Sequence, residues 1–161
     1  MMGFCCTSDN KKFHEICKDM KKELKLNEEV YNQVLVFCWA QAGQWENINE
    51  YINMKKPACS PAAIGEICFG LGKREISKAA FLKVADADDK INLLIEYEFW
   101  EDAVKQAFVH KKQEEYLPEL QAKGGHLVEK YIRMAENEMK ARWSTHLNKT
   151  KHDYYTNYKQ I

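Results

Sequence analysis

Residues 70–84 read GLGKREISKAAFLKV, and this stretch predicts the fold class of the whole chain. A glycine-containing turn is followed by Glu75 near the start of a helix and then by apolar residues at helical spacing. Residues 40–54 (AQAGQWENINEYINM) and 96–110 (EYEFWEDAVKQAFVH) follow the same order. Helical hairpins of this length must stack to bury their apolar faces. We therefore predict an all-α fold, specifically a short right-handed α-solenoid of stacked helical hairpins.

The composition of the 161-residue chain agrees with a helical domain and disfavours several function classes. Apolar residues make up 45%, whereas glycine and proline number only 7 and 3, so turns are scarce. Basic and acidic residues balance at 24 each, which gives no field of one sign for binding nucleic acid. We expect the six cysteines to be free thiols in a cytoplasmic protein, with no disulfide framework.

The sequence divides into three parts. We expect a flexible N-terminus at residues 1–10, the α-solenoid domain at 11–143 and a C-terminal tail at 144–161, where the apolar period is lost. Within the domain, Gly124-Gly125 is expected to break the chain before a last amphipathic helix. The helix expected just before this break contains Pro118, which predicts that the helix is kinked or begins late.

Local signals at helix starts are clear in three places. Asn27 is expected to cap one helix, and Ser60 to cap another that has Pro61 at its first position. Asp86 or Asp88 is expected to cap a third. The acidic cluster around Asp86 lacks the glycine and distal glutamate of a calcium loop, so capping explains it better than calcium binding.

No arrangement of residues predicts catalysis, a metal or a cofactor. Cys5, Cys6, His14 and Cys17 could supply four zinc ligands, but their spacing matches no standard zinc knuckle. No nucleophile stands beside a base, and the histidines lie among polar residues or end a helix, as solvated histidines do. We therefore expect a protein that is not an enzyme and holds no metal or cofactor, with a small thiol or zinc enzyme as the least favoured hypothesis.

The N-terminus carries a second alternative. The residues from Gly3 to Thr7 fit the pattern for N-myristoylation, and Cys5 and Cys6 could accept palmitate. Met1 interrupts this pattern, because acylation of Gly3 requires translation to start at Met2. An acylated peripheral membrane protein, or a free-standing helical-repeat adaptor, is the alternative function that this leaves open.

Large aromatic residues are abundant on the predicted helices. We expect most of them to be core residues, although tryptophan and tyrosine are also strong anchors at protein interfaces. The expected core tryptophans are Trp39, Trp45, Trp100 and Trp143.

Residues 11–125 contain an ordered set of features that resembles a known family, the C-terminal domain of vacuolar protein sorting subunit 16. The spacing is nearly free of gaps, and specificity comes from the order of the set. The matching residues are Phe13, Lys25-Leu26, Tyr31, Ala40, Trp45-Glu46, Lys55-Lys56, Ser60-Pro61, Glu66-Ile67-Cys68, Glu75, Ala79, Lys90, Leu93-Leu94, Ala103-Val104 and Ala107. The chain departs from the family at Ile76, where alanine is usual, and at Phe99-Trp100, where smaller residues stand.

The resemblance implies a scaffold that acts by binding. Members of this family belong to the HOPS and CORVET membrane-tethering complexes, and their C-terminal solenoid binds a Sec/Munc-type protein, the vacuolar protein sorting subunit 33. By this resemblance we expect that partner, further tethering-complex subunits, and peripheral attachment through the complex to endosome, lysosome or vacuole membranes. The family's propeller and upstream solenoid are not found in this sequence, which we interpret as a fragment or a shortened paralogue.

The family uses its upstream side for the partner, so we place the protein-binding surface on the first two predicted helices, residues 11–24 and 28–42. These helices carry more apolar surface than one neighbouring layer can cover. The residues expected to bind the partner are Phe13, Ile16, Met20, Val30, Tyr31 and Val34.

Overall fold

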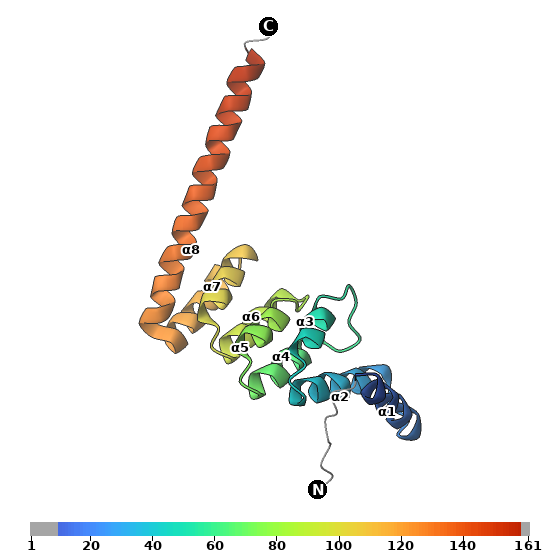
Figure 1. Cartoon of the computed structure of the whole chain (residues 1–161). Helices are drawn as coiled ribbons and strands as arrows, with labels where there is room; N and C mark the ends of the chain where they lie inside the picture. The colour runs from blue at the N-terminus through green and yellow to red at the C-terminus, as the bar shows by residue number, and fades with distance from the viewer. Residues whose placement is uncertain (1–9, 159–161) are drawn as a thin grey trace. The chain divides into compact units, whose positions relative to one another are not determined.

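A computed structural model describes the backbone of residues 10–158 and the side chains of residues 15–145. Over this backbone range the chain is all-α, with eight helices and no strand, which confirms the predicted class (Figure 1). The helices are α1 (Asn10–Glu23), α2 (Glu28–Gln41), α3 (Trp45–Ile52), α4 (Pro61–Gly70), α5 (Arg74–Phe81), α6 (Ala87–Glu96), α7 (Trp100–Val109) and α8 (Gln113–Tyr158).

The predicted helix caps are confirmed. The Asn27 side chain accepts a hydrogen bond from the Val30 amide at 2.8 Å, and Ser60 Oγ accepts one from the Ala63 amide at 3.2 Å. Asp86 is the cap of α6, because its Oδ1 accepts hydrogen bonds from the amides of Asp88 and Asp89 at 2.9 and 3.0 Å. Each side chain thus satisfies amides that a helix start leaves without backbone partners.

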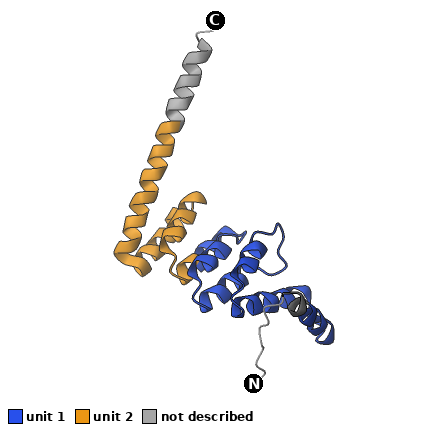
Figure 2. Ribbon diagram, viewed as in Figure 1, with its two compact units in different colours: residues 1–93 blue, residues 94–161 orange. Residues whose placement is uncertain are grey.

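The chain forms two compact units, residues 1–93 and 94–161, and the division falls within α6 (Figure 2). In the first unit, α2 packs against α3 and α4, and α5 packs against α3 and α4. Their apolar faces form one core, which includes the fully buried residues Val36, Ile48, Ile64 and Cys68. Burying these side chains is the main favourable contribution to the stability of this unit.

Helices α4 and α5 approach each other closely at Gly65. Gly65 lies in the middle of α4, and a Cβ at residue 65 would overlap the buried ring of Phe81. Glycine inside a helix costs about 1 kcal/mol relative to alanine. Here the absence of a side chain lets the two helices approach, and the ring of Phe81 fills the space.

In the second unit, α7 packs against α8. Gly125 has φ 54° and ψ −136°, a conformation that favours glycine, and it divides α8 into residues 113–124 and 126–158. Gly124 is also constrained, since a Cβ there would overlap the side chain of Val128 and lie 3.3 Å from Trp100. The predicted break at Gly124-Gly125 is therefore confirmed.

Two expectations about α8 differ from the structure. The helix begins at Gln113 and contains Pro118, so the alternative of a late start is wrong. The helix also continues past Trp143 to Tyr158, although residues 144–161 show no sustained apolar period. Helical hydrogen bonds within one chain do not require an apolar face, so periodicity alone cannot mark the end of such a helix.

Among the residues that the structure describes, no helix has the combination of length and apolar character needed to cross a bilayer.

The contact between Gly65 and Phe81 can be tested by adding one methyl group. Gly65→Ala should lower the free energy of unfolding by ~1–3 kcal/mol, because overpacking against a fixed ring outweighs the gain in helix propensity. Thermal and urea unfolding measure this change. Gly70→Ala is the matched control, since nothing lies within 4 Å of its added Cβ.

Gly65→Ala should lower the free energy of unfolding by less when it is made in a Phe81→Leu background, because the aromatic ring is absent there. Equal losses in both backgrounds, or a stabilised Gly65→Ala variant, would contradict the proposed close approach.

Candidate protein-binding surface

Side chains near the end of α1 contact side chains at the start of α2. Lys21 of α1 forms an ion pair with Glu28 of α2, and its Nζ lies 4.7 Å from the centre of the Tyr31 ring. Hydrogen bonds from Lys21 and Asn32 lower the pKa of Glu28. Cys17, on the next turn of α1, is buried. These contacts position α1 beside the N-terminal half of α2.

Helix α2 has a buried side and an exposed apolar line. Its buried apolar residues, Leu35, Val36, Trp39 and Ala40, belong to the core of the first unit. In contrast, Val30, Val34 and Phe37 keep 38%, 38% and 49% of their surface exposed. Their spacing of four and three residues places them along one line of the helix. We call these three residues the exposed α2 face.

The expected binding residues occupy different environments. Ile16 is exposed, Met20 and Tyr31 are half-buried, and Val30 and Val34 belong to the exposed α2 face. The side chain of Phe13 lies outside the described residues. Tyr31 makes contacts within the chain. Its ring contacts Lys21, and burial and then the neighbouring Cys17 raise the pKa of its hydroxyl. The exposed residues are therefore the better candidates for binding a partner.

Phe37 was not among the expected binding residues, although it belongs to the exposed α2 face. Its spacing of seven residues from Val30 was a visible signal, since it adds a third member to the same line of α2. The prediction that Trp143 is a core residue is wrong, because 64% of its surface is exposed. Trp39 is buried, whereas Trp45 and Trp100 are half-buried.

The buried thiols have little nucleophilic character. Burial raises the pKa of Cys68 to about 11, and burial together with the charge of Glu29 raises that of Cys59 to about 11. The thiolate is the reactive form, so both remain almost entirely protonated near neutral pH. The Cys59 amide donates a hydrogen bond to the Tyr51 hydroxyl at 3.0 Å, which ties the loop before α4 to the core. These cysteines pack as small apolar residues.

The metal-binding alternatives involve residues at the edge of the described chain. Cys5 and Cys6, and the side chain of His14, lie outside the described residues, and Cys17 is buried against α2. Residues 15–145 contain no cluster of three or more histidine, cysteine or acidic side chains suited to a metal ion. Asp86 uses its carboxylate to cap α6.

Comparison of the chain with protein-family models, with curated proteins and with solved structures gave no match. The exposed α2 face is a line of partly exposed apolar side chains in the first unit. Its side chains stand on a helix whose other side is held in the core, so they are presented on a rigid support.

The buried thiols predict how stability depends on pH. Each buried thiol has a pKa of about 11 in the folded chain, against 9.0 for a solvent-exposed thiol such as that of the unfolded chain, so its stabilising effect is complete below pH 9 and is lost as pH rises through 11. Cys68→Ala should make the fall in unfolding free energy over this range shallower, by at most about 1.4 kcal/mol per pH unit. Urea unfolding at a series of pH values measures the slope.

Val36→Ala is the control, because it also removes buried volume but has no titrating group. It should lower stability equally at every pH. If the unfolding free energy of Cys68→Ala falls with pH as steeply as that of the parent chain, the raised pKa of Cys68 would be refuted.

Proposed function

We propose that this chain is a non-enzymatic, helical-repeat scaffold that binds a partner protein through the exposed α2 face. The observation that supports the proposal is the partial exposure of Val30, Val34 and Phe37 along one line of a helix that is otherwise held in a core. Surface apolar residues are ordinary when scattered, but a continuous apolar line on a rigid helix is typical of a docking site.

The energetics favour binding over packing within the chain as the role of this face. Complete burial of an aliphatic or aromatic side chain is worth ~1.5–3 kcal/mol relative to exposure, and these three side chains retain over a third of their surface. A partner that covers these side chains would gain the part of this burial free energy that folding of the chain leaves unused. Ile16 of α1 is 52% exposed and can extend the same kind of contact on the neighbouring helix.

The architecture and biological setting are proposed from the sequence. Repeating helical hairpins in residues 40–54, 70–84 and 96–110 support a right-handed α-solenoid. The resemblance to the C-terminal domain of vacuolar protein sorting subunit 16 supports a role in an endosomal, lysosomal or vacuolar tethering complex. The partner is then a Sec/Munc-type protein related to vacuolar protein sorting subunit 33.

The proposal predicts that charge on the exposed α2 face will abolish binding without unfolding the chain. Val34→Asp and Phe37→Asp should each weaken capture of the Sec/Munc-type protein at least about tenfold, because an unpaired carboxylate would be buried at the interface. Isothermal titration with the purified partner measures affinity, and circular dichroism measures folding. Because both positions are partly exposed, the helical signal should be retained.

Met54→Asp serves as the control, since Met54 is 53% exposed in the same unit but lies outside α2. It should bind like the parent chain. Folded α2 variants that bind with unchanged affinity would exclude this face. Failure of the parent chain to bind the Sec/Munc-type protein would instead exclude the tethering role and favour a free-standing adaptor.

A further inference from the structure

The apolar face of α8 continues beyond the point where α7 covers it. Val128, Ile132 and Ala135 lie on this face and are buried. Met139 and Trp143 follow at spacings of four residues, which keeps them on the same face, yet they are 39% and 64% exposed. From residue 136 to residue 145, every described side chain of α8 is exposed. Over residues 136–145, helix α8 therefore presents an apolar face that no other described helix covers.

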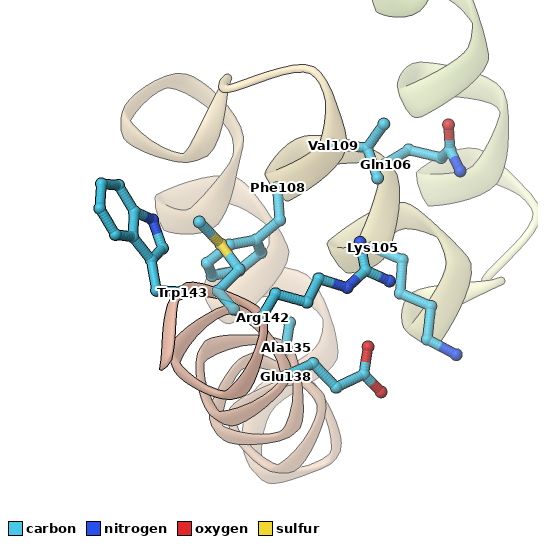
Figure 3. Close-up of a pocket in the computed structure, with 9 residues that line it drawn as sticks. Lys105, Gln106, Phe108, Val109, Ala135, Glu138, Arg142 and Trp143 are labelled. Atoms are coloured by element: carbon cyan, nitrogen blue, oxygen red, sulfur yellow. The ribbon is translucent and has the colours of Figure 1, made fainter. Parts of the chain in front are cut away.

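A cavity of about 510 Å³ lies beside this face, between the C-terminal half of α7 and the middle of α8 (Figure 3). Phe108 and Val109 line it from α7, and Met139 and Trp143 line it from α8. Ala135, a small residue on α8, leaves room between them. The volume falls within the range of ~300–1,000 Å³ that is typical of binding pockets. The cavity is large enough to accept a large side chain from another protein.

Both signs of charge border the cavity. Glu138 and Arg142 lie one helical turn apart on α8, and both line the cavity. Arg142 forms no ion pair with any other described side chain, whereas Lys105 on the α7 side hydrogen-bonds to Glu101 at 2.6 Å and also interacts electrostatically with Glu138. The guanidinium of Arg142 is therefore available to a carboxylate from outside the chain.

These features make the surface complementary to itself. It contains a protruding aromatic ring and a cavity, and an available cation and a carboxylate. An interface around a two-fold axis uses the same patch on both subunits, so that patch must contain both members of each complementary pair. A surface for a strongly acidic or basic partner would instead carry one sign of charge.

We propose that a second copy of this chain docks on this face, with the two α8 helices antiparallel. Antiparallel packing centred near residue 140 reverses the order of residues, so Arg142 of each copy faces Glu138 of the other. In the same arrangement, Trp143 of each copy enters the cavity of the other beside Met139. The dimer buries the apolar face that α7 leaves uncovered and does not involve the exposed α2 face.

Sedimentation velocity of the full chain over a range of concentrations tests the proposal. The parent chain should form a species of twice 18.9 kDa. Trp143→Ser should raise the dimer dissociation constant at least about tenfold, because the ring is the central anchor. Leu127→Ser is the matched control, since Leu127 is 50% exposed but lies on a different face of α8. It should leave the dimer intact.

A charge exchange gives a sharper test. Glu138→Arg and Arg142→Glu should each weaken the dimer about tenfold or more, because each places like charges opposite one another. The double variant should restore dimerisation, since the exchange recreates both pairs. Circular dichroism should show unchanged helicity in all variants, because both residues are exposed.

Two results would overturn the proposal. The first is a parent chain that remains monomeric at every concentration, which would assign the cavity to a different protein. The second is a dimer whose dissociation constant is unchanged by Trp143→Ser and by both charge reversals, which would place the interface elsewhere.

Discussion

The absence of a side chain at residue 65 is the constraint on which the first unit depends. The ring of Phe81 occupies the position that a Cβ would fill, and this allows α4 and α5 to approach. Helix α2 packs on α4, and α3 packs on both α2 and α5, so the close contact between α4 and α5 is part of one packed core of four helices. The buried side of α2 is fixed by this core, and its exposed side is fixed as a consequence.

Rigid support and exposed apolar surface together distinguish a docking site from a poorly packed helix. On α2, Trp39 is buried and lies edge-on to Tyr51, with ring centres 5.9 Å apart. Tyr51 in turn accepts a hydrogen bond from the amide of Cys59. A helix anchored in this way would lose little further conformational freedom if a partner covered Val34 or Phe37, so more of the hydrophobic gain would remain as affinity.

In the second unit, the extent of burial along α8 depends on the different lengths of α7 and α8. Helix α7 ends at Val109, whereas α8 continues to Tyr158. The same face of α8 is therefore core at Ile132 and surface at Trp143. Isolated helices in water gain little stability from propensity alone, so an uncovered segment of this kind is best stabilised by packing against another chain.

The sequence by itself determined the all-α class, the caps at Asn27 and Ser60, a cap at Asp86 or Asp88, and a break at Gly124-Gly125, whereas the structure assigned the last cap to Asp86 and the break to Gly125. These features depend on hydrogen bonds and backbone angles among residues within a few positions of one another, so local sequence is sufficient. Only the tertiary structure decided that Trp143 and Phe37 are exposed while Cys59 is buried. An apolar residue on a helix is covered only where a neighbouring helix reaches it, and that reach depends on contacts between segments distant in the sequence.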